Sequence, residues 1–215
     1  MSPSFIKKKI WIVCESSDTG TDKKLIERLL ADHEINFDHY EIQAKGSIGK
    51  VIDYLKTGLI ASPEISSKNI ETVLVIVDAD ENPVNRFNEI HNCFDQSFFC
   101  VQPDLNSPTP ISSEKVNVGI FLFPDKQNPG SLETLCLNAL DDSSCNQKLR
   151  CVDRYLDCLK TSNVDVNMTE NNISKSKFRI FMATPCPDRY VPSIIDCIDT
   201  QASAFHKILD FLKLS

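Results

Sequence analysis

Three short apolar runs constrain the fold of this chain more than any other feature of its sequence. They are IWIVC at 10–14, VLVIV at 73–77 and GIFLF at 119–123, and each is nearly continuous rather than alternating. Strands that are covered on both faces of a largely parallel sheet have this pattern. A fourth segment, HYEIQA at 39–44, alternates and is predicted to lie nearer an edge of the sheet.

Helical periodicity fills the intervals between these runs. Apolar stripes at helical spacing are centred in the segments 25–30, 48–55, 87–94 and 132–139. Ser47 is a natural N-cap for the second of these helices, while Asn82 and Pro83 are suited to the first two positions of the third. The alternation of strands and helices predicts an α/β fold, with a mostly parallel sheet and helices on both faces.

The length of 215 residues is typical of a single domain, which we expect to span residues 1–215. Prolines and serines predict a loop at 102–116. Residues 141–176 are predicted to form an insertion, with a helix at 145–160 and a polar, flexible linker at 161–176. A short amphipathic helix formed by Phe205, Ile208, Leu209 and Leu212 closes the chain as a C-terminal extension.

Composition and charge limit the classes of function. A net charge of -7 and a pI of about 5.1 give no electrostatic footprint for nonspecific binding to nucleic acid or membranes, although they allow a local basic groove. Because no apolar stretch approaches the ~20 residues that span a bilayer, and the N-terminus does not resemble a signal peptide, we expect a cytoplasmic protein. The nine cysteines include no C-x2-C pair, which favours buried free thiols over zinc ligands.

Acidic residues follow each of the three apolar runs. Glu15 comes after the first run, Asp78 and Asp80 after the second, and Asp125 after the third. Ligands bind beyond the carboxyl ends of the strands in open parallel sheets, and residues two apart in an extended segment point to the same side, so Asp78 and Asp80 are predicted to converge. Oxygen ligands without His or Cys suit Mg²⁺ or Mn²⁺. The pattern therefore predicts a divalent-metal site at this edge.

Each acid also has a simpler interpretation when it is considered alone. Carboxylates after strands are common as helix N-caps or in solvated turns. Glu133, in the segment PGSLETL at 129–135, falls in the first turn of a predicted helix, where the helix dipole and free N–H groups stabilise a negative charge. Glu15 and Glu133 alone favour this structural role, whereas the pair Asp78 and Asp80 at one strand exit favours a metal site, and the gathering of all the acids at one edge strengthens that interpretation.

These segments together resemble the Toprim domain of topoisomerases, primases and overcoming-lysogenisation-defect nucleases. The Toprim pattern has a glutamate after the first strand, a glycine-bearing segment after the second and Asp-x-Asp after the third. The matching segments here are WIVCESSDTGTDKKLIERLL, IQAKGSIGKVIDYLKT and VLVIVDADENP. Two later segments, VGIFLFPDKQNPGSLETL and SKSKFRIFMATPCP, are similar to an uncharacterised Toprim-like prokaryotic family, which extends the resemblance over roughly residues 9–212.

The resemblance implies a metal-dependent nuclease that hydrolyses phosphodiester bonds in DNA or RNA with Mg²⁺ or Mn²⁺. Glu15 would bind metal or act as general acid/base, and Lys177 would approach the scissile phosphate. The metal ligands would be Glu15, Asp78, Asp80, Asp125 and Glu133, with the last two completing a second metal position. Two metals can stabilise both the attacking and the leaving oxygen. Related nucleases often work with an ABC-type ATPase in defence against phage, so such an ATPase is an expected partner, and the oligomeric state stays open.

Two other functions remain as alternatives. The chain departs from the pattern at Ser16, where the family has Gly, at Lys126, where it has Asn, and at Ser131, where it has Met. The departures at Ser16 and Lys126 favour a catalytically inactive Toprim-like module that binds metal, nucleotide or a partner. A phosphoacceptor receiver domain also has an aspartate after its third strand. It needs an acidic pair directly after the first strand, however, and this chain lacks one.

Overall fold

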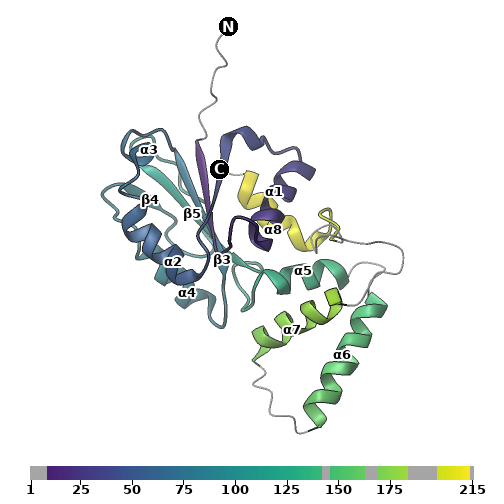
Figure 1. Ribbon diagram of the computed structural model, residues 1–215. Coiled ribbons are helices and arrows are strands. Elements are labelled where there is room, and N and C mark those ends of the chain that lie inside the picture. The colour runs from purple at the N-terminus through teal and green to yellow at the C-terminus, as the bar shows by residue number, and fades with distance from the viewer. Residues whose placement is uncertain (1–8, 142–145, 163–168, 184–197, 214–215) are drawn as a thin grey trace.

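The protein is an α/β fold built on a five-stranded parallel sheet (Figure 1). The computed structural model describes residues 9–141, 146–162, 169–183 and 198–213. The strand order is β2-β1-β3-β5-β4, and every neighbouring pair is parallel. The strands are β1 (Ile10–Cys14), β2 (Tyr40–Ala44), β3 (Thr72–Asp78), β4 (Phe99–Val101) and β5 (Val116–Phe123).

Helices cover both faces of this sheet, as predicted. One face carries α2 (Ile48–Asp53), the π-helical turn η2 (Tyr54–Gly58), α3 (Pro63–Ser66) and α4 (Pro83–His91). The other carries α1 (Thr21–Asp32), α5 (Leu132–Asp141), α6 (Asn146–Thr161), α7 (Glu170–Ala183), the 3-10 turn η4 (Ser203–Phe205) and α8 (His206–Lys213). A further 3-10 turn, η1 (Phe37–His39), precedes β2. Within the part of the chain that is described, no helix is long and apolar enough to cross a membrane.

The central strands are continuously apolar because successive side chains enter two different cores. In β3, Leu74 and Ile76 pack toward α1 and α8, while Val73, Val75 and Val77 pack toward α2 and α4. Strand side chains alternate between the two faces of a sheet, so the interior of a strand with both faces buried is apolar at successive positions. All residues of β3 before Asp78 are buried.

Most of the predicted elements are confirmed, including the place of β2 at an edge of the sheet. Two short elements were missed, along with helix α7 described below: the three-residue strand β4, which forms the opposite edge, and the four-residue helix α3. Both are too short to produce a periodic signal.

The prediction of a polar linker at 161–176 is wrong in its second half. Helix α7 begins at Glu170, while residues 163–168 lie outside the described part of the chain. The polar start of α7 gives no helical stripe, but Phe178 and Phe181 further along are buried against the core. Packing against α5 and α6 therefore stabilises a helix that the periodicity of its own sequence does not indicate.

Candidate functional site

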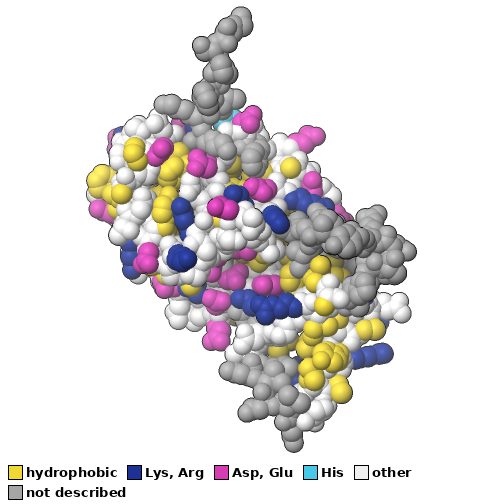
Figure 2. Space-filling view, viewed as in Figure 1, with side chains coloured by type: hydrophobic (Ala, Val, Ile, Leu, Met, Phe, Trp, Pro, Cys, Tyr) yellow, Lys and Arg dark blue, Asp and Glu magenta, His cyan; other side chains and the backbone are white. Residues whose placement is uncertain are grey.

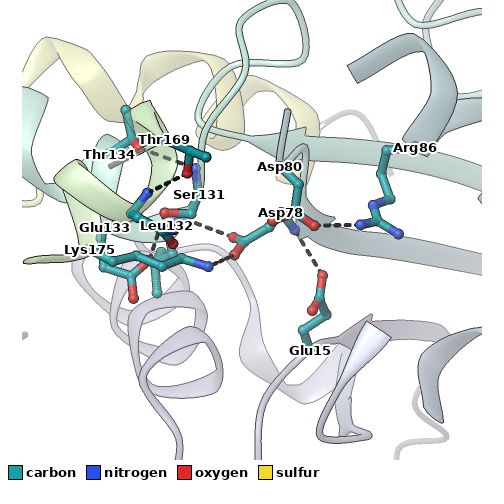
Figure 3. Close-up of polar contacts among 11 residues, drawn as sticks. Glu15, Asp78, Asp80, Arg86, Ser131, Leu132, Glu133, Thr134, Thr169 and Lys175 are labelled. Atoms are coloured by element: carbon teal, nitrogen blue, oxygen red, sulfur yellow. Dashed lines mark hydrogen bonds and ion pairs between the residues drawn. The ribbon is translucent and has the colours of Figure 1, made fainter. Parts of the chain in front are cut away.

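The strand order places Glu15 beside Asp78 at the carboxyl edge of the sheet. β1 and β3 are neighbours, with Cys14 in register with Ile76, so the residues that follow both strands meet. The main-chain N–H of Asp78 donates a hydrogen bond of 3.1 Å to Oε1 of Glu15 (Figure 3). Two of the predicted metal ligands, which are 63 positions apart in sequence, are thus in direct contact.

Asp78 connects the end of β3 to two helices. Its Oδ1 accepts a 2.9 Å hydrogen bond from the N–H of Leu132 at the start of α5, and its Oδ2 lies 3.4 Å from Nζ of Lys175 on α7. Only 16% of the Asp78 side chain is exposed. A carboxylate at a helix N-terminus is stabilised by the free N–H groups there, so this contact alone is also a sound structural cap.

Asp80 does not converge on Asp78 in the predicted way. Its φ of 53° is left-handed, so the segment Asp78–Asp80 is not extended and the two-residue periodicity of a strand does not apply. Its main chain pairs with Gly130 through hydrogen bonds of 2.9 and 2.7 Å. Its Oδ2 lies 2.5 Å from Nη2 of Arg86 on α4, whose Nη1 lies 2.5 Å from Oε2 of Glu89. In Figure 3 the two aspartates face different cationic partners.

The remaining predicted ligands, Glu133 and Asp125, have different surroundings. Glu133 lies in the first turn of α5, accepts a 2.7 Å hydrogen bond from Oγ of Ser131, and is close enough to raise the pKa values of Asp78 and Asp22 by charge repulsion. Asp125 instead accepts hydrogen bonds from the amides of its own turn and lies 3.0 Å from Nζ of Lys207 on α8. Burial alone would raise the pKa of Asp125, but these donors outweigh it and lower the pKa. Its described contacts are those of a structural turn.

Asp22 belongs with these acids, although the sequence argument did not select it. It lies in the first turn of α1, which begins just after the loop that leaves β1. Burial raises its pKa to about 7, and repulsion from Asp78, Glu15 and Glu133 adds to the shift. A usable signal was present, because an acid at the start of the helix after the first strand must lie at the carboxyl edge of the sheet. We name the set Glu15, Asp22, Asp78, Asp80 and Glu133 the acidic cluster.

Three members of the acidic cluster, Glu15, Asp22 and Asp78, have raised pKa values. Burial raises the pKa of Glu15 to about 7, with the charge of Asp78 as the next cause, and burial likewise raises the pKa of Asp78 to about 6. Burial by itself would lower the pKa of Lys175, but the negative charges of Asp78 and Glu133 have the larger combined effect and raise it. Mutual repulsion in a desolvated setting is thus only partly relieved by the nearby cation.

The donor set of the acidic cluster fits a hard divalent cation, because all five side chains offer carboxylate oxygens. The side chains are not arranged around a common point: in the described part of the chain, no group of three or more His, Cys, Asp or Glu residues is placed to hold a metal ion. Asp78 and Asp80 are instead turned toward Lys175 and Arg86. Metal binding would therefore require both aspartates to exchange a cationic side chain for the ion.

The lysine near the acids is Lys175 and not the predicted Lys177. Nζ of Lys177 lies 2.8 Å from Oδ1 of Asp153 on α6. Residues two apart on a helix point in nearly opposite directions, so only one of these lysines can face the sheet edge. The repeated SKSK sequence offers no means to choose between them, and the packing of α7 on α5 decides the choice.

The surface around the acidic cluster is polar and hollowed. A hollow of about 700 Å³ lies between α4 and the start of α7, with Asp80, Asn85, Arg86, Glu89, Thr169 and Asn172 in its lining. Figure 2 shows acidic side chains gathered near the middle of this face of the molecule, beside a band of basic side chains.

A larger hollow of about 1000 Å³ lies at the opposite, amino edge of the sheet. Its lining includes the exposed apolar side chains of Ile60, Phe98 and Ile111. This larger hollow lies away from the acidic cluster, whereas the smaller, polar hollow is lined by Asp80 of that cluster.

Comparison with known proteins identifies a family but no activity. A family model described as "Protein of unknown function (DUF3226)" matches residues 12–215, so the chain belongs to this family. No curated protein and no solved structure matches the chain. The resemblance to Toprim nucleases therefore stays a prediction.

Proposed function

We propose that this member of the DUF3226 family is a divalent-metal-dependent phosphodiesterase of the Toprim type that acts on DNA or RNA. The observation that carries the proposal is the meeting of Glu15, Asp22 and Asp78, three acids from separate elements, at the carboxyl edge of the sheet, where burial and mutual repulsion raise their pKa values. Concentrated, desolvated negative charge opposes folding, and such perturbed groups are typical of functional sites.

Each residue of the acidic cluster has a role in this proposal. Asp78, Asp80 and Glu15 would hold the ion, and Asp22 and Glu133 would complete the set of oxygen donors. When bound, Mg²⁺ or Mn²⁺ would supply Lewis-acid stabilisation of the phosphate and lower the pKa of a water molecule. Where Glu15 does not bind the ion, its pKa, which burial raises to about 7, suits it to accept or donate a proton near neutral pH. Lys175 would neutralise negative charge on the phosphate.

The proposed substrate requires basic side chains around an otherwise acidic protein. Lys175 on α7 pairs with Asp78 of the acidic cluster, and Nζ of Lys23 on α1 lies 3.4 Å from Oδ1 of Asp18 in the loop after β1. We further propose that the protein works in the cytoplasm and that an ABC-type ATPase contributes to its grip on nucleic acid. The ATPase partner depends on the resemblance to the related nucleases.

The test is calorimetric titration of Mn²⁺ into the wild-type protein and into an Asp78→Asn/Asp80→Asn variant. We expect saturable binding to the wild type and none to the variant. Asp53→Asn is the matched control, since Asp53 is an exposed acid at the end of α2 and its loss should leave binding unchanged. Cleavage of single- and double-stranded DNA and RNA would then be assayed with the same proteins. Absence of Mn²⁺ binding to the wild type would refute the proposal.

The second candidate is a Toprim-like binding or regulatory module without catalysis. The pairing of Asp78 with Lys175 and of Asp80 with Arg86 favours it, because both aspartates are already neutralised by the protein itself. Such a module should cleave neither DNA nor RNA, and where its ligand is a partner protein it should keep the same midpoint of thermal unfolding whether Mn²⁺ or a chelator is present. A metalloenzyme should instead be stabilised by the ion, by an amount that grows with its concentration.

A further inference from the structure

We propose that Arg86 regulates metal binding by competing with the divalent ion for Asp80, and that Glu89 retains the guanidinium when Asp80 turns to the ion. This inference rests on the proposed function, since it concerns the same metal site. Its premise is the chain Asp80–Arg86–Glu89, in which one guanidinium bridges two carboxylates at 2.5 Å each.

The main chain around Asp80 is fixed, so exchange of its partner requires only a side-chain rotation. Two hydrogen bonds tie its N–H and C=O to Gly130, and the next residues lead into the capped start of α4, where Oδ1 of Asn82 accepts from the N–H of Asn85. The carboxylate of Asp80 is 37% exposed and faces the 700 Å³ hollow. The Asp80 side chain therefore has space to rotate while its main chain stays in place.

Arg86 is placed as a competitor rather than as a satisfied structural residue. Its side chain is 14% exposed, and its buried Nε has no hydrogen-bond partner among the described residues. A buried donor without a partner opposes folding, and a structural arginine would be expected to use more of its five donors. The guanidinium is also close enough to Glu15 to lower the pKa of that carboxyl, which brings Arg86 within the field of the acidic cluster.

Glu89 lowers the free-energy cost of moving Asp80 from Arg86 to the ion. It lies one helical turn from Arg86 on α4, is 48% exposed, and already holds Nη1. When Asp80 leaves, Arg86 keeps one carboxylate partner and is not left as an unpaired buried charge, a situation that is strongly unfavourable. Without Glu89, the guanidinium would depend on Asp80 alone and would hold it more firmly.

The experiment measures Mn²⁺ affinity by calorimetry in Arg86→Gln, Arg86→Lys and Glu89→Gln. Removing the competitor in Arg86→Gln should tighten binding about tenfold, Arg86→Lys should lie between Arg86→Gln and the wild type, and Glu89→Gln should weaken binding by about threefold. Glu89→Gln changes an exposed side chain and keeps the test valid if Arg86→Gln proves poorly folded. The Nε–H signals of ¹⁵N-labelled arginine offer a readout independent of catalysis, because the Arg86 signal should shift on Mn²⁺ binding.

The Asp80→Asn background separates local competition from a general effect of charge. If Arg86 acts through Asp80, both Arg86→Gln and Glu89→Gln should leave the affinity of Asp80→Asn unchanged, whereas a long-range charge effect would persist. Weaker or unchanged binding in Arg86→Gln, or effects that persist in the Asp80→Asn background, would overturn the inference while the metal site stands. Failure of both the wild type and Arg86→Gln to bind Mn²⁺ would overturn the proposed function as well.

Discussion

Replacing Asp78 by Asn should make the metal-free protein more stable at pH 8, which is the reverse of the usual effect of changing a buried, hydrogen-bonded residue. Asn keeps an oxygen that accepts from the N–H of Leu132, while it removes the negative charge and replaces the oxygen beside Lys175 by an amide NH2 group. A structural cap would be weakened by this change. If Asp78 is instead a metal ligand that is held buried and charged at a cost in stability, the same change should stabilise the metal-free protein.

The magnitude follows from the pKa of Asp78, which burial raises from 3.8 to about 6. An acid with a raised pKa stabilises the folded state fully below its unfolded pKa, and this contribution is lost as the pH rises through the folded pKa. At about 1.4 kcal/mol per unit, the ionised form costs up to about 3 kcal/mol, and this figure already includes the attraction of Lys175. We expect a gain of about 1–3 kcal/mol at pH 8, because relaxation of the site reduces the full value.

The assay is urea unfolding with a chelator at pH 8 and again at a pH of about 4, where wild-type Asp78 is protonated and the advantage of Asn should disappear. The matched control is Asp125→Asn at another strand end: its pKa is lowered, so this change should reduce stability at pH 8. If Asp78→Asn is less stable than wild type by 1 kcal/mol or more at pH 8, Asp78 is a structural cap and the argument from strained carboxylates is refuted. If Asp78→Asn is the more stable protein without metal, addition of Mn²⁺ should make the wild type the more stable one only if the metal site exists.

Three further outcomes test other parts of the argument. Because Glu15 and Asp22 both have pKa values raised to about 7, the free energy of unfolding of the metal-free wild type should fall as the pH rises from about 4.5 to 7, and saturating Mn²⁺ should flatten that slope in urea titrations. Asp125→Asn should lose about 1–2 kcal/mol of stability through its turn hydrogen bonds, yet calorimetry should give an unchanged Mn²⁺ affinity; a weakened affinity would return Asp125 to the metal site. Lys175→Ala should lower kcat for phosphodiester cleavage by about 100-fold, whereas Lys177→Ala, which breaks only the pair with Asp153, should leave kcat within about twofold; the opposite ranking would restore the prediction made from sequence.

The sequence was sufficient for the fold because the information it needs is local. A run such as VLVIV can be buried on both faces only in the interior of a sheet, and the apolar stripes between the runs specify helices that cover those faces. Periodicity fails where an element is too short to repeat, as in β4, or where tertiary packing supplies the stability, as in α7. The two misses therefore have different physical origins.

For the candidate site, the sequence determined that acids leave β1 and β3 at the carboxyl edge of the sheet. It could not determine which side chains meet there, because this depends on strand order and helix packing rather than on spacing along the chain. The neighbouring positions of β1 and β3 bring Glu15 to Asp78, and the placement of α1 adds Asp22.

The cationic partners were decided by tertiary structure alone. The packing of α7 on α5 selects Lys175 over Lys177, and the left-handed main chain at Asp80 turns that carboxylate to Arg86. Local burial patterns in the sequence therefore determine where negative charge is concentrated. The geometry that sets its proton affinity and its partners arises only when segments distant in sequence pack together.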